Sequence, residues 1–324
     1  MPDTSGRLRA ARELRGFIRR AGRTATSPGI GRAALEALRG VLPYDCAALA
    51  RWDPLTGRHA TVAAVGYPPD ALRFMDHRMH ADPLYAQVRR DRGPLRVRDI
   101  PRPRRRGPVF DAVIDPLGFA DGLTQCLFAR DGRYLGMLNA STLTRGHPDD
   151  DAVTMLELLA DDLGDMLDPI PAASPPTRAL AGGDAEGLLV TCAGVTALSA
   201  NACPDLTATG SPLRPVLDAA LAGRQPPRRL LVLTGTRLFT VTLDGDTHGV
   251  VVLHRPAAAP FGLTLRELEV LDAVSRGRTN AEIARALHIT PRTVATHIEH
   301  VLTKTGAPNR VAVTRLATQL GLLI

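Results

Sequence analysis

The chain has 324 residues, a formal net charge of +7 and 44% hydrophobic residues, so we expect two or three domains with buried cores and a polyanionic partner. Lys304 is the single lysine among 40 basic residues, which excludes P-loop ATPases, protein kinases and phosphoreceiver domains, because each needs a lysine in its own motif. The motifs of serine hydrolases, metalloproteases and dinucleotide enzymes are also missing, so we expect no enzyme and no cofactor.

The amino-terminal sequence has no apolar segment of the kind that directs secretion. No run of about 18 apolar residues is long enough to span a bilayer. We therefore expect a cytoplasmic protein without membrane contact.

Residues 1–170 predict an α+β domain with flanking helices. Apolar residues at helical spacing predict three helices, at residues 6–23, 29–43 and 149–168. Runs of β-type residues predict strands at 46–53, 60–66, 123–130 and 134–142. Asp131-Gly132, which joins the last two strands, is a dipeptide typical of hairpins.

This order of elements, with the paired strands around residues 129–132, resembles a GAF-type sensory domain. The resemblance places Cys126 and Met137 on the hairpin that would line a GAF-type cavity, but apolar residues there are expected to be core, and a ligand pocket is the alternative. The first helix is rich in arginine and the helix at 149–168 in aspartate. We expect these two helices to pack together or across a two-fold axis, mainly through apolar faces, because exposed ion pairs contribute under about 1 kcal/mol each.

The sequence PIPAASPPTRALAGG, residues 169–183, is rich in proline, alanine and serine and is not expected to form a helix or a central strand. We therefore predict a linker at 171–183. The following residues, 184–257, give strand, helix and three strand-like runs, and they resemble a small PAS-like sheet domain.

Residues 258–324 predict an all-α domain of four helices. Thr264 with Glu267 and Thr279 with Glu282 have the spacing of capping boxes. Thr290 precedes Pro291, which suits the first position of a helix, and Asn309 is placed to cap the last helix. Gly277 and Gly306 are expected to end helices. The second and third helices are linked by only about four residues, as a helix-turn-helix requires.

These residues identify the domain as a member of the LuxR/GerE family of helix-turn-helix domains. The matching runs are Leu263-Thr264-x-Arg266-Glu267-x-Glu269-Val270-Leu271, Gly277-x-Thr279-Asn280-x-Glu282-Ile283-Ala284 and Leu287-x-Ile289-Thr290-x-x-Thr293-Val294-x-x-His297, followed by Lys304, Asn309 and Arg310. The resemblance covers about a fifth of the chain. It implies that residues 291–305 form a recognition helix in the major groove of double-stranded DNA.

The resemblance also implies contacts to phosphates from Thr290, Thr293 and Lys304, with Arg278, Arg292 and Arg310 as further candidates. Ala295, Thr296 and Glu299 are expected to face the bases. The complete set of expected DNA-binding residues is Arg278, Thr290, Arg292, Thr293, Val294, Ala295, Thr296, His297, Glu299, Lys304 and Arg310.

Ala295 stands where a lysine is common in the family. Residues 261–324 contain eight Lys/Arg and five Asp/Glu, a net charge of +3. We therefore expect weaker electrostatic attraction to DNA and an altered site preference.

The last helix is expected to form a homodimer contact through Val311, Val313, Leu316, Leu320 and Leu322; the alternative is that these residues pack only within their own domain. The expected function is a one-component transcriptional regulator, gated at its amino-terminal domains by a small-molecule or protein effector. The alternative is an interaction protein whose sheet domains bind a partner protein, with DNA contact secondary.

Several other patterns favour ordinary structural roles. The scattered cysteines and the Trp52-Asp53 pair are expected to lie in the core. The arginine cluster at 102–106 is expected to be a solvated loop. His77 and His80 have a possible metal-binding spacing but no evident third ligand, so we expect no metal site.

Overall fold

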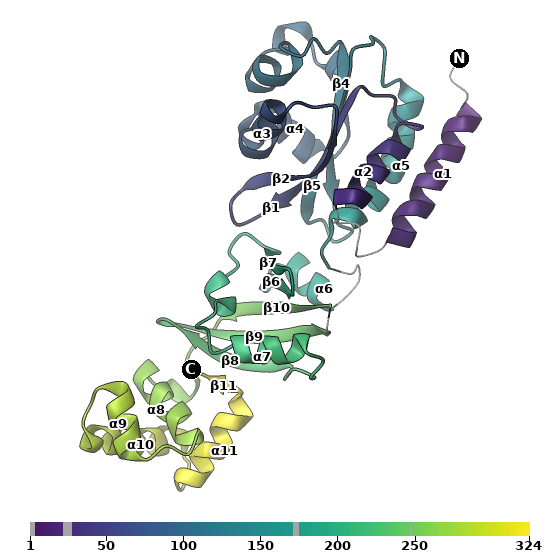
Figure 1. The fold of residues 1–324 in the computed structure, drawn as a ribbon. Helices are drawn as coiled ribbons and strands as arrows, with labels where there is room; N and C mark the ends of the chain where they lie inside the picture. Colours follow the sequence, from purple (N-terminus) through teal and green to yellow (C-terminus); the bar gives the residue numbers. More distant parts are fainter. Residues whose placement is uncertain (1–3, 22–27, 171–174, 247) are drawn as a thin grey trace. The chain divides into compact units, whose positions relative to one another are not determined.

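The computed structural model describes residues 4–21, 28–170, 175–246 and 248–324. The chain divides into two compact units, residues 1–181 and 182–324, and the division falls inside the predicted linker at 171–183. Each unit is described by itself (Figure 1). No helix within the described residues is both long enough and apolar enough to cross a membrane.

The first unit contains a five-stranded antiparallel sheet with the strand order β2-β1-β5-β4-β3. The strands are β1 (Cys46–Asp53), β2 (Arg58–Val65), β3 (Leu95–Arg96), β4 (Asp121–Phe128) and β5 (Tyr134–Thr142). The predicted hairpin is confirmed, because β4 pairs with β5 and Gly132 adopts a φ of 89° in the turn.

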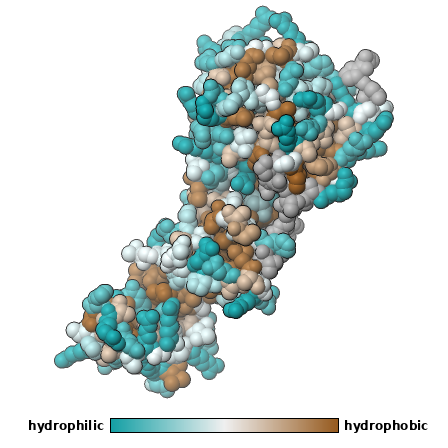
Figure 2. All heavy atoms as spheres, in the orientation of Figure 1, coloured by the Kyte–Doolittle hydropathy of each residue, from teal (hydrophilic) through white to brown (hydrophobic). Residues whose placement is uncertain are grey.

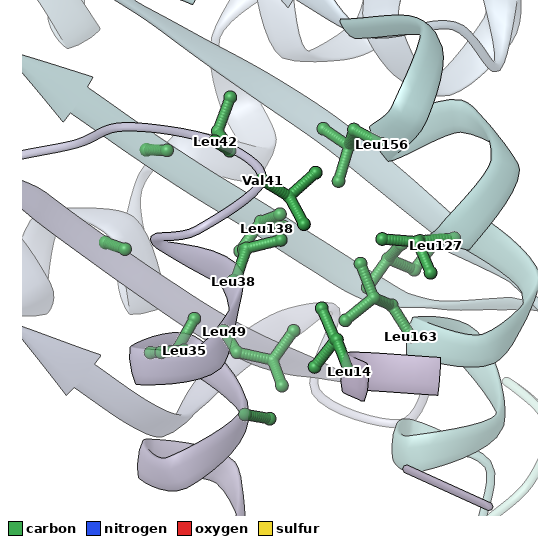
Figure 3. Close-up of a cluster of buried hydrophobic side chains, with 14 of the residues drawn as sticks. Leu14, Leu35, Leu38, Val41, Leu42, Leu49, Leu127, Leu138, Leu156 and Leu163 are labelled. Atoms are coloured by element: carbon green, nitrogen blue, oxygen red, sulfur yellow. The ribbon is translucent and has the colours of Figure 1, made fainter. Parts of the chain in front are cut away.

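Helices cover both faces of this sheet (Figure 1). One face carries α1 (Thr4–Ala21), α2 (Pro28–Leu38) and α5 (Asp150–Leu167), whose leucines interlock with those of the strands in the buried cluster of Figure 3. The other face carries α3 (Pro69–His77) and α4 (Pro83–Asp91). The short helical turns of this unit are η2 (Met79–Ala81), η3 (Val97–Asp99), η4 (Arg102–Arg104) and the π-helical η5 (Phe110–Ile114).

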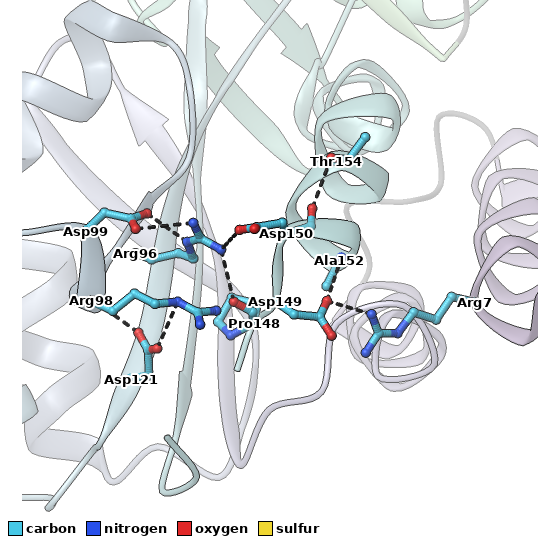
Figure 4. Close-up of polar contacts among 10 residues, drawn as sticks. All are labelled: Arg7, Arg96, Arg98, Asp99, Asp121, Pro148, Asp149, Asp150, Ala152 and Thr154. Atoms are coloured by element: carbon cyan, nitrogen blue, oxygen red, sulfur yellow. Dashed lines mark hydrogen bonds and ion pairs between the residues drawn. The ribbon is translucent and has the colours of Figure 1, made fainter. Parts of the chain in front are cut away.

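The expected packing of the first helix on the acidic helix is confirmed within one chain. Leu14 of α1 and Leu163 of α5 are buried in the same cluster. Arg7 Nη1 lies 2.6 Å from Asp149 Oδ1, beside the start of α5 (Figure 4), and Arg15 Nε lies 2.6 Å from Asp162 Oδ2. The apolar faces and these ion pairs together hold α1 against α5.

The candidate ligand-binding residues of the first unit, Cys126, Met137, His77 and His80, do not come together in a binding site. Cys126 and Met137 are buried on the α3/α4 face, but the small cavity on that face is lined by other residues, among them Tyr67, Asp82 and Asn139. The two side chains therefore pack in the core, as expected, and do not line this cavity. His77 ends α3 whereas His80 lies in the next turn, so the two imidazoles do not share one helix face.

The second unit contains a six-stranded sheet with the order β11-β8-β9-β10-β6-β7. Its strands are β6 (Glu186–Thr191), β7 (Gly194–Ala197), β8 (Arg229–Thr234), β9 (Arg237–Asp246), β10 (Gly249–Pro256) and β11 (Leu322–Leu323). All pairs are antiparallel except β11 with β8. Helix α7 (Arg214–Leu221) packs on one face, and η6 (Pro204–Thr207) precedes it.

The expectation that residues 169–183 form no helix is wrong, because α6 spans Pro175–Ala181. Its two prolines lie at the first turn, where their missing N–H groups would have no intrahelical partner. The all-α part follows η7 (Pro260–Gly262) and consists of α8 (Leu265–Ser275), α9 (Asn280–Leu287), α10 (Pro291–Thr305) and α11 (Arg310–Leu320). The four predicted helices are confirmed.

Candidate nucleic-acid interface

A tight turn joins α9 to α10 and sets the angle between them. α9 ends at Leu287, and its cap residue His288 adopts the left-handed conformation with a φ of 55°, while Ile289 N donates to Ala284 O at 3.0 Å. Thr290 then caps α10, since its Oγ1 accepts from Thr293 N at 3.1 Å, and Pro291 is the first helical residue. Three residues therefore separate the two helices, in the manner of a helix-turn-helix.

The predicted caps of the other helices are also present. Thr264 with Glu267 and Thr279 with Glu282 form complete capping boxes. Asn309 Oδ1 accepts from Ala312 N at 3.0 Å at the start of α11, and Gly306 ends α10. These local hydrogen bonds explain why the sequence alone locates the helix ends.

One side of α10 belongs to the core. Val294 and Val301 are 0% and 1% exposed and pack in one cluster with Leu268 and Ile283 from the neighbouring helices. The expectation that Val294 belongs to the DNA-binding set is therefore wrong, because its side chain is fully enclosed by the domain.

A second side of α10 is free. Arg292, Thr296, Glu299 and Thr303 are exposed and recur at spacings of three and four residues, so they form one stripe along the helix, with the half-buried Ala295 beside it. Helices α9 and α10 are largely covered by hydrophilic residues on the face shown in Figure 2. The structure thus brings together four of the expected residues, Arg292, Ala295, Thr296 and Glu299, on an accessible surface.

A third side of α10 holds a row at the same spacing: Thr293, His297, His300 and Lys304. This row lies next to the start of α8, where Lys304 Nζ is 2.7 Å from Glu267 Oε2 and donates to Gly262 O at 3.1 Å. Burial raises the pKa of the Glu267 carboxyl, but hydrogen bonds from Lys304 and Thr264 outweigh it and hold the pKa below its usual value. Lys304, expected at a phosphate, therefore also holds α10 against α8.

Two arginines hold other helix ends together. Arg310 donates to Asn280 Oδ1 at 3.1 Å and to the carbonyl of Arg278, which joins the start of α11 to the start of α9. Arg266 pairs with Glu269 at 2.7 Å and donates to the carbonyl of Leu287 at the end of α9. Sequence reasoning missed these structural roles, although Arg266 and Asn280 both stood in the matching runs.

The residues expected at a dimer contact of α11 are unequally available. Val313 and Leu322 are 1% and 7% exposed and pack within their own unit, so both are wrong as contact residues. Leu316 and Leu320 are half-buried, whereas Val311 is 77% exposed. A dimer contact at this helix stays a prediction that depends on Val311 and its neighbours.

The last residues of the second unit extend the sheet that precedes the helices. After α11, Gly321 turns with a φ of 60°, and a Cβ there would lie 2.9 Å from Arg229 O, so glycine suits both the conformation and the space. Leu322 and Leu323 then pair in parallel with Leu231 and Val232 of β8. Sequence reasoning missed this strand because a two-residue parallel pairing has no periodicity of its own.

Comparison with known proteins bears on this part of the chain. Residues 262–317 match the family described as bacterial regulatory proteins, luxR family. The putative HTH-type transcriptional regulator Rv0890c of Mycobacterium tuberculosis is 43% identical over 67 residues, which is 21% of this chain and 8% of the relative. The response regulator protein VraR of Staphylococcus aureus is 41% identical over 61 residues, 19% of this chain and 29% of VraR. The chain thus spans under a third of either relative's length.

Solved structures match the chain more distantly. The GAF domain from a phosphoenolpyruvate-protein phosphotransferase of Coxiella burnetii is 17% identical with a TM-score of 0.40, covering 56% of this chain and 99% of that domain. The LBD domain of VqsR from Pseudomonas aeruginosa is 15% identical with a TM-score of 0.38, covering 49% of this chain and 98% of that domain. These scores are too low to transfer a function.

The turn between α9 and α10, the capping boxes and the family match all concern the same residues. Residues 262–317 are a helix-turn-helix domain of the luxR family of bacterial regulatory proteins.

Proposed function

We propose that the chain is a transcriptional regulator that binds double-stranded DNA by inserting α10 into the major groove. The exposed stripe of Arg292, Thr296 and Glu299 carries this proposal, because it leaves one side of the helix free while Val294 and Val301 anchor the other. Thr296 offers a hydroxyl and Glu299 an acceptor for the amino group of cytosine, and both are groups that read base edges.

The amino end of α10 is suited to the DNA backbone. The unpaired N–H groups and the positive dipole end of a helix favour a phosphate, and Arg292 adds a positive charge there. Thr290 and Thr293 place two hydroxyls at the same end, with their oxygen atoms 2.8 Å apart. In this proposal these groups orient the helix, and the exposed stripe selects the sequence.

The proposal includes four functional parts: residues 1–170 as a GAF-like sensory or dimerisation domain, 171–183 as a linker, 184–257 as a PAS-like domain and 258–324 as the DNA-binding domain. An effector at the amino-terminal domains or a homodimer would gate DNA binding. The pairing of β11 with β8 supports gating from the 184–257 sheet, since a strand of that sheet contacts the end of the DNA-binding domain directly.

The test begins with selection of duplexes from a random library by the full chain, followed by fluorescence anisotropy on the enriched sequence. We expect sequence-specific binding. A plot of the logarithm of the association constant against the logarithm of the salt concentration should have a slope shallower than about −8, since the domain carries a net charge of +3. A steeper slope would contradict the expected weak electrostatic attraction. Failure to enrich any duplex at low salt would overturn the proposed function.

Two variants separate orientation from reading. Arg292→Ala should weaken binding to all duplexes alike and reduce the salt slope by about one, whereas Glu299→Gln should change the preferred sequence. Arg32→Ala, which removes an exposed arginine of α2 in the first unit, is the matched control for charge. Equal DNA affinity in Arg292→Ala and Arg32→Ala would contradict the placement of α10 at the DNA interface.

A further inference from the structure

We propose that Glu267, His297 and His300 form a binding site for a divalent transition-metal ion such as Zn²⁺, joining α8 to α10. Each residue offers one ligand atom, and the three atoms lie within 4.8 Å of one another. Two imidazole nitrogens and one carboxylate oxygen are a donor set that Zn²⁺ takes in proteins when a fourth position is left to water. This site does not depend on the proposed function, because it concerns the stability of the domain itself.

The two histidines are placed for a shared ligand. They lie three residues apart on α10 and therefore project from the same side of the helix. The Nδ1 of His297 is buried and has no hydrogen-bond partner within the described part of the chain. A buried polar atom without a partner is costly, and coordination of a metal ion would satisfy it.

The carboxylate has one oxygen to spare. Oε2 of Glu267 accepts from Thr264 N and from Lys304 Nζ, each at 2.7 Å, whereas Oε1 lies 3.6 Å from Nδ1 of His300. The Glu267 side chain is only 4% exposed, so its position is held by the surrounding groups. Oε1 therefore faces the histidines and is the atom that would bind the ion.

The geometry needs a small closure. With bonds of about 2.0 to 2.2 Å to zinc, the ligand atoms of a tetrahedral site lie about 3.4 Å apart, so the cluster must contract by roughly 1 Å. His300 can provide this movement, because its side chain is 58% exposed and unconfined. The ammonium group of Lys304 opposes the incoming cation, and we infer that it limits the affinity of the site.

The donor set also predicts selectivity. Imidazole suits zinc and its neighbours among the transition metals, whereas Mg²⁺ prefers oxygen ligands and keeps its waters. The site should therefore take Zn²⁺ or Co²⁺ and leave Mg²⁺ in solution.

Calorimetric titration of the full chain with Zn²⁺, in a buffer that does not bind metals, tests the site. We expect one equivalent to bind, and we expect Co²⁺ at this site to show the visible absorption of a tetrahedral complex. In His300→Ala the affinity should fall at least about tenfold, since even the loss of an outer partner of a metal ligand typically costs 10- to 100-fold. His300 is exposed, so this variant is expected to fold.

His288→Asn is the matched control, because it removes an exposed imidazole of the same domain and asparagine tolerates the left-handed conformation at that position. It should bind Zn²⁺ like the unchanged chain. Lys304→Gln should bind Zn²⁺ more tightly than the unchanged chain, because the competing positive charge is gone. Absence of Zn²⁺ uptake, or equal affinity in His300→Ala and His288→Asn, would overturn the proposal.

Discussion

The sheets of the two units place their first five strands in the same order, since in each the first strand lies between the second and the fifth, and the second sheet adds β11 beside β8. They differ in what covers them. The first sheet has helices of its own unit on both faces, α1, α2 and α5 on one and α3 and α4 on the other. In the second sheet, α7 covers one face of β8 and β9, and the helices of the helix-turn-helix domain cover the opposite face.

Successive residues of β8 show this difference most clearly. Leu230 and Val232 belong to the cluster with α7, whereas Leu231 and Leu233 belong to the cluster with the helices of the helix-turn-helix domain. Because side chains alternate along a strand, one strand serves two cores. The first unit therefore completes its core alone, while the sheet of the second unit shares a core with the helices that we propose bind DNA.

Leu268→Ala tests the shared core with the largest expected effect. Leu268 is fully buried in α8, so its truncation should cost about 2 to 5 kcal/mol. If sheet and helices are one cooperative unit, hydrogen exchange will accelerate in β8 as well as in α8. Leu38→Ala, at a fully buried position of the first unit, should leave both elements unchanged. Faster exchange in the helices alone would show that the sheet and the helices do not unfold as one cooperative unit.

Acid should unfold the first unit through His59. Burial, with smaller contributions from His80 and Arg89, lowers the pKa of His59 from 6.5 to about 3. Because the unfolded chain takes up the proton first, stability is complete above about pH 6.5 and falls by roughly 1.4 kcal/mol per pH unit down to about pH 3. Trp52, the only tryptophan, lies 4.8 Å from His59 between ring centroids and reports the transition by fluorescence.

His59→Gln should flatten this slope, and His77→Gln, at an exposed histidine of the same unit, should leave it unchanged. Parallel slopes in all three chains would show that another group governs the acid transition.

In the second unit, Lys304→Met should lower stability by about 1 to 2 kcal/mol, because it leaves the buried Glu267 carboxylate without its cation while the partial exposure of Lys304 weakens the pair. Since the pKa of Glu267 is lowered by folding, its contribution is present above the ordinary carboxyl pKa and disappears as the pH falls through the lowered value. The deficit of the variant should therefore shrink in acid. Adding Glu267→Gln should recover much of it at neutral pH; chemical denaturation of each chain gives the comparison.

The smallest expected effects concern ion pairs of the first unit. Arg7→Ala should cost about 1 kcal/mol, because the Arg7 side chain is 7% exposed and holds the residue that caps α5. Arg32→Ala should cost about 0.3 kcal/mol, since Arg32 and Glu36 are mostly exposed. Thermal unfolding of both variants should rank them in this order, and equal losses would show that burial does not decide the value of these pairs.

The sequence located what depends on neighbouring residues. The caps at Thr264, Thr279, Thr290 and Asn309 are confirmed, because each hydrogen bond joins residues three apart in the chain. The hairpin of the first unit is also confirmed, because a short turn joins two strands that follow one another in the chain.

Apart from the packing of α1 on α5, contacts between distant residues were not foreseen. The pairing of Lys304 with Glu267, the burial of Val294 and the strand at Leu322 each depend on how helices pack, and composition and periodicity do not report that. Helix α6 was missed for a different reason, because its prolines were taken as breakers although they lie at its start.

The alternation along β8 limits how a signal can cross this strand. A slip of one residue would turn Leu231 and Leu233 toward α7 and Leu230 and Val232 toward the helices of the helix-turn-helix domain, exchanging every neighbour at once. A change on the α7 side that keeps this register would reach the other side as a tilt or a displacement of the strand. Transmission of that kind is graded in angle and requires no hinge.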